Sequence, residues 1–248
     1  YLTVPAIASA LGAKAAIIEN VITVVRDKHN VVEISKSLFR SAGFHVGDDQ
    51  CTTLKAENYG VPQMRRRHFI AVGKGFDIPL VQTAEKLKSD PVTIKQAIND
   101  TRSLNGSDVF NSHALLSEKN QVRINFLHDN DLFELPNHQR PDCHKDGHTY
   151  PSVYGRLNGA NVSNTITTGF MSPGRGRYIH YEERRGLTPH EAARLQGFPD
   201  TFKFEIGSGR QLGNSAFSKL IGDAVPPALG FVAGVASLSS LIASNPHE

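Results

Sequence analysis

Uninterrupted apolar runs near the N-terminus, followed by looser alternation, predict an α/β fold. The four residues at 15–18 are all apolar, a pattern typical of a strand that is buried on both faces of a parallel sheet. Residues 27–42 place apolar side chains on one helical face and end at Gly43, which predicts an amphipathic helix. Ligands of open sheets gather at the carboxyl ends of the strands, and Glu19 directly follows this strand.

Residues 44–55 and 67–73 alternate in the manner of strands, and they pair most simply as an antiparallel hairpin. The connection carries a Gly-Val-Pro-Gln turn, followed at once by three arginines. Because side chains alternate along a strand, Gln63, Arg65 and Arg67 are expected on one face. An amide and two fixed cations on one face suit a phosphate, or a base that must be held and polarised.

The predicted first strand needs neighbours on both sides, and the hairpin supplies only one of them. The 12 residues at the start of the chain contain no glycine-rich turn of the nucleotide-binding kind. A half sheet by itself would leave a long apolar edge open to aggregation. We therefore expect the first half of the fold to come from elsewhere, either on the same polypeptide or on a second subunit.

The middle of the chain, from about residue 76 to 150, is polar and has few periodic apolar runs. It predicts an irregular segment, which is either a recognition region on a scaffold or a variable surface insertion. Residues 151–181 contain short β-prone pieces separated by glycines, which predict a small twisted sheet.

Two helices are predicted after this segment. Thr188 has the features of an N-cap, Pro189 suits the first helical position, and Glu191 would close a capping box. A final Ala/Leu/Val-rich helix is expected at about 226–243, entered through two prolines.

Positive charge is clustered although the formal net charge is only +3. The clusters are the three arginines at 65–67, Arg175 with Arg177, and Arg184 with Arg185. Such clustering favours a polyanionic partner.

A hydrophobic content of 39% is sufficient for a core. No run approaches the roughly 20 apolar residues of a membrane span, and no apolar leader opens the chain, so we expect an intracellular protein without a membrane partner. Cys51 and Cys143 form neither a disulfide framework nor a CxxC pair. Histidines near Cys143 make zinc conceivable, but the prediction is that no metal is bound.

Four segments, in order, resemble motifs of the DNA cytosine-5 methyltransferases. Ile18-Glu19-Asn20-Val21 resembles the sixth motif, and the residues from Asn58 to Arg67 resemble the eighth. Residues 184–200 are similar to the ninth motif almost position for position. Residues 219–227 resemble the tenth, with Asp223 in place of the usual Asn.

The resemblance implies roles for individual residues. Glu19 would hydrogen-bond the target cytosine at ring nitrogen 3 and the exocyclic amine, and burial would raise its pKa. Arg65 and Arg67 would hold the base and its phosphate. Four DNA-binding residues are expected in addition to these catalytic ones: Gln63, Thr167 near the backbone of the flipped nucleotide, and Arg175 and Arg177 at phosphates.

The implied cofactor is S-adenosylmethionine, in a pocket that Asp223, Ala224 and Val225 would line. The carboxylate of Asp223 either weakens cofactor binding or pairs with the ligand's amino or sulfonium charge. The family's nucleophile is a cysteine in a Pro-Cys loop, and neither Cys51 nor Cys143 stands in that context.

The resemblance also implies a fold and a division into domains. We expect an α/β protein with a partial, Rossmann-like methyltransferase sheet and a small, irregular, mostly β target-recognition domain. Residues 1–76 would belong to the catalytic domain and 77–212 to the target-recognition domain. Residues 213–248 would carry the tenth motif and a closing helix that returns to the catalytic domain.

The implied function is methylation of ring carbon 5 of a flipped cytosine in a short site of double-stranded DNA. Restriction-modification is the expected setting and the cytoplasm, in association with the nucleoid, the expected location. The chain resembles the C-terminal part of such an enzyme and is not expected to methylate without the N-terminal catalytic half. The alternatives are a separate DNA-recognition subunit without activity of its own, and an RNA cytosine-5 methyltransferase.

Overall fold

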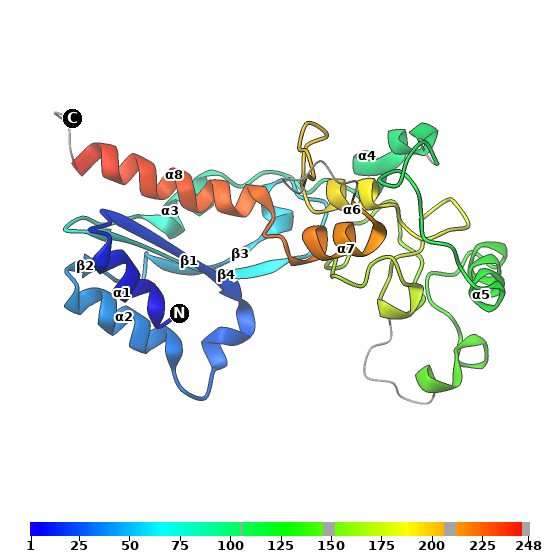
Figure 1. Cartoon of the computed structure of the whole chain (residues 1–248), viewed down its shortest axis with the longest axis horizontal. Coiled ribbons are helices and arrows are strands. Elements are labelled where there is room, and N and C mark those ends of the chain that lie inside the picture. The colour runs from blue at the N-terminus through cyan, green and yellow to red at the C-terminus, as the bar shows by residue number, and fades with distance from the viewer. Residues whose placement is uncertain (105, 146–151, 206–211, 245–248) are drawn as a thin grey trace. The chain divides into compact units, whose positions relative to one another are not determined.

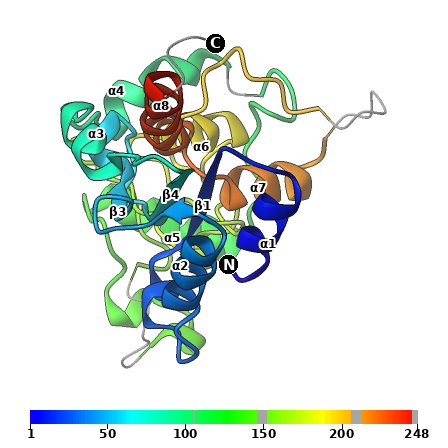
Figure 2. The ribbon, with the colours of Figure 1, turned by 90° about the vertical axis from the view of Figure 1, so that its left-hand side faces the viewer.

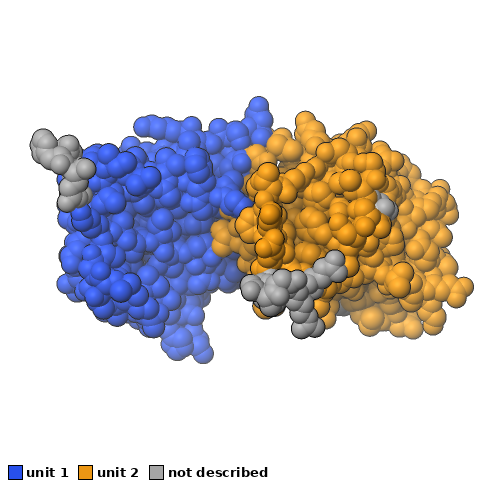
Figure 3. Space-filling model, turned by 45° about the horizontal axis from the view of Figure 1, so that its top comes forward, with its two compact units in different colours: residues 1–59, 65–90, 227–248 blue, residues 60–64, 91–226 orange. Residues whose placement is uncertain are grey.

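The computed structural model describes residues 1–104, 106–145, 152–205 and 212–244. The chain divides into two compact units, which Figure 3 shows in different colours. Unit 1 comprises Tyr1–Tyr59, Arg65–Asp90 and Pro227–Glu248, and unit 2 comprises Gly60–Met64 and Pro91–Pro226. Residues 77–90 therefore belong to the first unit and residues 213–226 to the second. The predicted functional boundaries at 76 and 212 stay predictions.

Unit 1 is a sheet with helices on both faces. Its elements are α1 (Thr3–Ala10), β1 (Ala15–Val21), the 3-10 turn η1 (Ile22–Arg26), α2 (Val31–Ser41), β2 (Phe44–His45), β3 (Cys51–Lys55), η2 (Ala56–Tyr59), β4 (Arg66–Lys74), α3 (Leu80–Lys86) and α8 (Pro227–Ser244). Figures 1 and 2 both show α1 and α2 on one face of the sheet and α8 on the other. The helices predicted at 27–42 and 226–243 are confirmed as α2 and α8.

Strand β4 is the centre of the sheet. It pairs with β1 from Ala15 opposite Gly73 to Val21 opposite Arg67, and its other neighbours are β2 and β3. The hairpin predicted between 44–55 and 67–73 is thus confirmed. The expected parallel sheet is wrong for the described strands, because every pairing among them is antiparallel. An apolar run carries no information about the direction of its partner.

Strand β1 is less buried than its sequence predicts. Ile18 is 6% exposed and packs into the core with Phe39 and Ile70, whereas Ile17 is 42% exposed. Among the described residues β1 pairs with β4 alone, so the backbone of its second edge has no strand partner there. Among the described strands, β1 therefore lies at an edge of the sheet, and only one of its two faces is buried.

Unit 2 is built from short helices and turns. Its elements are α4 (Ile94–Ile98), η3 (Asn99–Leu104), α5 (Glu118–Asp129), η4 (Asn137–Gln139), η5 (Asp142–His144), η6 (Pro173–Arg175), α6 (Pro189–Leu195) and α7 (Asn214–Asp223). Its main core gathers Ile166, Phe170, Tyr178, Leu195 and Ile221. The middle of the chain is thus more helical than its polar composition predicts.

The small sheet predicted at 151–181 does not form among the described residues. Instead there are isolated bridges, in which Ile179 pairs with Arg156 on one side and with Gly186 on the other. Glycines at 155, 159, 169 and 176 lie against larger side chains that a Cβ would strike, so the segment packs by close approach rather than by ladders. The mostly β recognition domain is corrected accordingly.

One helical run, Asn214–Ser244, is long and apolar enough to cross a membrane by length and composition alone. Core helices of soluble proteins meet the same criterion, and α8 buries Leu229, Val232 and Ala236 in unit 1.

Candidate active site and nucleic-acid contacts

Glu19 and Arg67 form an ion pair across β1 and β4. Glu19 lies opposite Phe69 and Arg67 lies opposite Val21, so the two side chains are diagonal neighbours on one face of the sheet. The Nε atom of Arg67 is 2.9 Å from Oε1 of Glu19, and the two side chains are 15% and 26% exposed. The pair is therefore largely, though not wholly, shielded from solvent.

The pKa values of both partners are shifted toward the neutral forms. Burial raises the pKa of Glu19 above its ordinary value, against the opposing charges of Arg67 and Arg65. Burial likewise lowers the pKa of Arg67, against the attraction of Glu19. A pair whose ionisation is disfavoured in the fold stabilises it little, which is typical of sites that carry chemistry.

Arg65 belongs to the same cluster. It is 2% exposed, and its charge acts on the Glu19 pKa. Its carbonyl accepts a hydrogen bond from Ala56 N at 2.8 Å, which fixes the backbone at the entrance to β4. The predicted alternation is confirmed, because Arg65 is buried and its neighbours Met64 and Arg66 are exposed. The structure thus brings together the three residues predicted to be catalytic.

Cys51 lies on the opposite, core-facing side of this sheet. Its Sγ is 3.4 Å from Nε2 of His68, and it packs against the cluster that contains Phe39 and Ile70. Burial raises the pKa of the Cys51 thiol, which disfavours the thiolate needed for nucleophilic attack. This environment agrees with leaving Cys51 out of the predicted catalytic residues.

Gln63 is part of unit 2, where its amide is fully engaged. The side chain is 0% exposed; Nε2 donates to Leu195 O at 3.1 Å and to Gln196 Oε1 at 2.5 Å. Its Oε1 accepts from Ile166 N at 2.9 Å. A contact between Gln63 and DNA would require these bonds to break, and the contact stays a prediction.

Thr167 and Arg175 are exposed on unit 2, whereas Arg177 is held inside it. The hydroxyl of Thr167 is 3.0 Å from that of Tyr178. Arg177 Nη1 donates to Phe133 O at 2.7 Å and to Arg156 O at 3.0 Å, and Nη2 pairs with Glu134. Thr167 and Arg175 are therefore available to a polyanion, whereas the guanidinium of Arg177 is occupied by contacts within unit 2.

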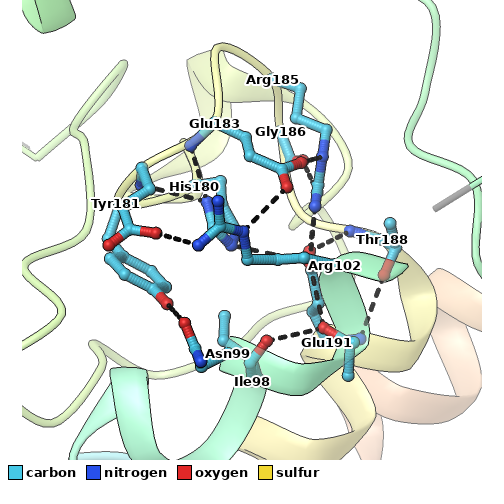
Figure 4. A network of polar contacts seen from close by, with 12 residues as sticks. Ile98, Asn99, Arg102, His180, Tyr181, Glu183, Arg185, Gly186, Thr188 and Glu191 are labelled. Atoms are coloured by element: carbon cyan, nitrogen blue, oxygen red, sulfur yellow. Dashed lines mark hydrogen bonds and ion pairs between the residues drawn. The ribbon is translucent and has the colours of Figure 1, made fainter. Parts of the chain in front are cut away.

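The helix α6 is anchored by a buried polar network, drawn in Figure 4. The predicted capping box is confirmed: Thr188 Oγ1 accepts from Glu191 N, and Glu191 Oε2 accepts from Thr188 N. Arg185 reaches the same carboxylate with two bonds of 2.8 and 2.7 Å. His180 is fully buried, and its Nδ1 accepts hydrogen bonds from the backbone N–H groups of residues 182 and 183.

This network corrects one reading of the sequence. Arg185 is buried and neutralised by Glu191, and Arg184 pairs with Asp129 at 2.6 Å, so this cluster is not a free polyanion surface. Arg185 is paired with Glu191, six positions further on, and this arginine is therefore structural.

One protein-family model, C-5 cytosine-specific DNA methylase, matches nearly the whole chain, from residue 2 to residue 235. The chain belongs to the C-5 cytosine-specific DNA methylase family. Type II methyltransferase M1.BsuMI of Bacillus subtilis (strain 168) is 39% identical over 219 residues, which are 88% of this chain and 49% of that protein. Type II methylase M.HgiDII of Herpetosiphon aurantiacus is 32% identical over 77% of this chain and 54% of its own length.

The chain spans about half the length of the curated relatives it matches. A solved structure described as a prophage-encoded DNA modification methyltransferase (E. coli) has a TM-score of 0.66, with 19% identity over 97% of this chain and 73% of its own. The S. pombe Dnmt2 methyltransferase has a TM-score of 0.57, with 15% identity over 92% and 67%. At these identities the two structures show the fold alone.

The C-5 methylase family uses S-adenosylmethionine as its methyl donor, which directs attention to residues 223–225. Asp223 ends α7 and lines a cavity of about 650 Å³ together with Arg175 and Ser172. Its carboxylate is 2.6 Å from Nζ of Lys219, and Ala224 O accepts from Gln196 Nε2 at 2.5 Å.

The donor set at 223–225 fits a ligand that carries positive charge. An exposed carboxylate matches an amino or sulfonium group, and Lys219 is the competitor that such a ligand would displace. Just before it, Gly222 packs so closely on residues 167–168 that a Cβ would lie 2.2 Å from Thr168 N. The segment next to the carboxylate is thereby fixed against the loop that carries Thr167.

Among the described residues, no group of three or more His, Cys, Asp or Glu side chains is arranged to hold a metal ion. Of the histidines near Cys143, His148 lies outside the described residues.

Proposed function

We propose that this chain is the C-terminal part of a DNA cytosine-5 methyltransferase of a restriction-modification system, which methylates cytosine in a short site of duplex DNA. The observation that carries the proposal is the partly buried Glu19–Arg67 pair, whose ionisation the fold disfavours. The relatives named above are a type II methyltransferase and a type II methylase, which supports the same assignment. A cytoplasmic location in association with the nucleoid follows from this role.

Glu19 would act as the proton carrier toward the base. Addition of a nucleophile at ring carbon 6 pushes electron density onto ring nitrogen 3, and a proton held there accepts that charge. A carboxyl group with a raised pKa keeps its proton closer to neutral pH than an ordinary glutamate, so it can supply it. Arg67 orients the carboxyl through its Nε contact, and Arg65 adds positive charge beside it.

Unit 2 would hold the nucleic acid. Thr167 and Arg175 are exposed and suit contacts with backbone phosphates, which position the duplex without reading its sequence. Arg177 would act mainly by holding the segment that carries Arg175, since its guanidinium is bonded to Phe133 and Arg156 carbonyls. A contact of Gln63 with DNA remains part of the proposal only if its internal amide bonds open on binding.

Asp223, Ala224 and Val225 would hold one side of S-adenosylmethionine, which supplies the methyl group when bound. The role of this chain is to present the Asp223 carboxylate and the backbone of the following two residues. The carboxylate is exposed and paired with a flexible lysine, so exchanging that lysine for a ligand cation breaks no buried contact.

The nucleophile and most of the cofactor pocket would come from the N-terminal catalytic half. Two observations support this: the chain spans about half of its relatives, and β1 has an edge without a strand partner among the described residues. Ile17 on that strand is substantially exposed. A strand of the N-terminal half that paired with β1 would cover both the backbone edge and this side chain.

The test is methyl transfer to duplex DNA, followed by mass spectrometry of the released nucleosides. The intact protein with its N-terminal half should form 5-methylcytosine, and residues 1–248 alone should form none. An RNA of the same sequence serves as the second substrate and is expected to stay unmodified. Methylation by residues 1–248 alone, or none by the intact protein on either substrate, contradicts the proposal.

A second candidate is a separate DNA-recognition subunit without activity of its own. It is favoured by one observation, that the residues suited to DNA contact lie in this chain whereas no Pro-Cys loop does. Mass measurement of the protein purified from its native source distinguishes the two. A mass near 27 kDa that co-purifies with a larger partner supports the subunit, and a single larger chain supports the enzyme.

A further inference from the structure

A second concentration of positive charge lies in unit 2, at residues that sequence reasoning did not single out. The start of α5 and the segment around η4 and η5 line an open pocket of about 450 Å³. Its charged and titratable lining consists of Lys119, Arg123, His138, Arg140, Asp142 and Lys145. Four permanent cations thus share one pocket with a single carboxylate, in a chain whose net charge is only +3.

The one carboxylate in the pocket is already paired. Asp142 Oδ1 is 2.6 Å from Nζ of Lys145, a contact that lowers the pKa of Asp142 and keeps it ionised. Three cations therefore remain without a carboxylate inside the pocket. Their mutual repulsion is relieved by an anion, since several positive charges that converge on a small volume raise the local electrostatic potential.

The two arginines of the pocket are fixed in place by neutral acceptors. Arg123 donates from Nε to Gln139 O at 3.2 Å, and its guanidinium lies over the ring of Tyr154 at 5.4 Å. Arg140 donates from Nε to Leu135 O at 2.9 Å. Nη1 of Arg123 also donates to Lys119 O at 3.3 Å and to Asn120 Oδ1 at 3.1 Å. These acceptors are all neutral, so they orient the two guanidinium groups without cancelling their charge.

Most other arginines of unit 2 differ from these two in having a carboxylate partner. Six of them are paired with Asp or Glu: Arg102, Arg156, Arg177, Arg184, Arg185 and Arg194. Among the described residues of this unit, carboxylate partners within 4 Å are lacking only for Arg123, Arg140 and Arg175. Arg175 is the residue that the proposed function places at a phosphate. The two arginines of the pocket share its distinguishing property.

We propose that this pocket binds a backbone phosphate of the duplex DNA, a contact additional to those of Thr167 and Arg175; this rests on the proposed function. Planar guanidinium groups match the geometry of phosphate oxygens. Lys119 adds a point charge, and Lys145 offsets the carboxylate of Asp142. The lining is mostly polar and charged, with Val122 and Pro141 as its apolar members, which suits a phosphate better than the flat apolar face of a base. The contact therefore contributes affinity and salt dependence, and it does not select the recognition sequence.

The test compares duplex binding by variants of the intact protein, using fluorescence anisotropy over a range of salt concentrations. Lys119→Gln combined with Lys145→Gln removes two pocket charges, and the carbonyl bonds of both arginines are kept. Lys28→Gln combined with Lys203→Gln removes the same charge from exposed positions and is the control. Asp142→Asn removes the only carboxylate of the pocket and has the opposite expected sign.

The pocket double variant should bind about 3- to 10-fold more weakly than the control at moderate salt, equally for a cognate and a scrambled duplex. Its slope of log affinity against log salt should be smaller by about 1, as expected for the loss of one phosphate contact. Asp142→Asn should bind more tightly than the parent.

Equal affinity and equal slope for the pocket variant and the control overturn the inference and leave the proposed function standing. A pocket for free anions alone would instead lose inorganic phosphate binding, measured by calorimetry, with no change in the DNA slope, and this also overturns it. If the parent binds no duplex at all, the proposed function fails and the inference fails with it.

Discussion

Nε of Arg67 lies 2.9 Å from Oε1 of Glu19 across the β1–β4 pairing, and burial shifts the pKa of each partner toward its neutral form. In an ion pair that stabilises the fold, the pKa of the carboxyl group would be lowered and that of the guanidinium raised, because each charge favours the ionised form of the other. The arrangement instead keeps a carboxyl group ready to hold a proton, in a fixed orientation. This relationship leads to the first two predictions.

Replacing Glu19 by Gln should remove methylation without harming the fold. The amide keeps the shape and an acceptor for Arg67 but cannot pass a proton to the base, so the rate of methyl transfer should fall by about 100-fold or more. Methyl transfer by the intact protein and its thermal unfolding midpoint are measured together. Glu33→Gln, at an exposed pair with Lys36, is the control and should keep its activity. A fully active Glu19→Gln enzyme would exclude the proton role.

The Glu19 pKa also predicts a pH dependence of stability. A carboxyl group whose pKa is raised in the folded state binds its proton more tightly there than in the unfolded chain, where the ordinary value is 4.5. Its stabilising contribution is complete below that value and is lost as the pH rises through the higher folded pKa. The free energy of unfolding, compared between parent and Glu19→Gln from pH 4 to pH 8, should shift in favour of the variant as the pH rises. A shift in favour of the parent would mean that the pair with Arg67 dominates.

Arg175 and Arg177 should respond differently to the same substitution. Arg175→Gln removes an exposed cation, so duplex affinity should fall, with a salt slope smaller by about 1 and an unchanged unfolding midpoint. Arg177→Gln breaks bonds to Phe133 O and Arg156 O, so its main effect should be a lower unfolding midpoint. Binding and denaturation curves of both variants test this. Equal loss of affinity with equal stability would place both arginines at phosphates.

The buried bond between Arg185 and Glu191 should be costly to break. Glu191→Ala leaves the guanidinium buried without its carboxylate and removes the capping box, with an expected loss of about 3–5 kcal/mol in the free energy of unfolding. Asp131→Asn weakens an ion pair with Arg156 at an exposed carboxylate and should cost less than about 1 kcal/mol. Urea denaturation separates the two values. Similar small costs would show that solvent reaches the Arg185 site.

Gly222 should tolerate no side chain. A Cβ there would lie 2.2 Å from the backbone nitrogen of Thr168, so Gly222→Ala should force α7 away from residues 167–168 and cost about 1–3 kcal/mol. Gly230→Ala in α8 is the matched change, because no atom lies within 4 Å of its Cβ, and it should be neutral or stabilising by up to about 1 kcal/mol. Thermal unfolding of both variants measures the difference, which disappears if α7 can shift freely.

Features set by neighbouring residues could be predicted from the sequence. Thr188, Pro189 and Glu191 define the start of α6, because a capping box closes between residues three positions apart. The alternation that buries Arg65 and exposes Arg66 follows from the two-residue repeat of a strand. The order of the motifs along the chain predicts Glu19 and Arg67 in one site, and the two side chains lie 2.9 Å apart.

Features that depend on distant partners were decided only by the tertiary structure. The apolar run of β1 gave no direction for its pairing, and its antiparallel register with β4 joins residues about 50 positions apart. Arg185 and Gln63 carry the same groups as residues that bind ligands, yet their partners in the fold consume them. Lys119, Arg140 and Lys145 carry no motif in the polar middle segment of the sequence, and only folding brings them around one pocket. The physical reason is that a charge acquires its role from what lies within a few ångströms of it, and in unit 2 those neighbours come from separate parts of the chain.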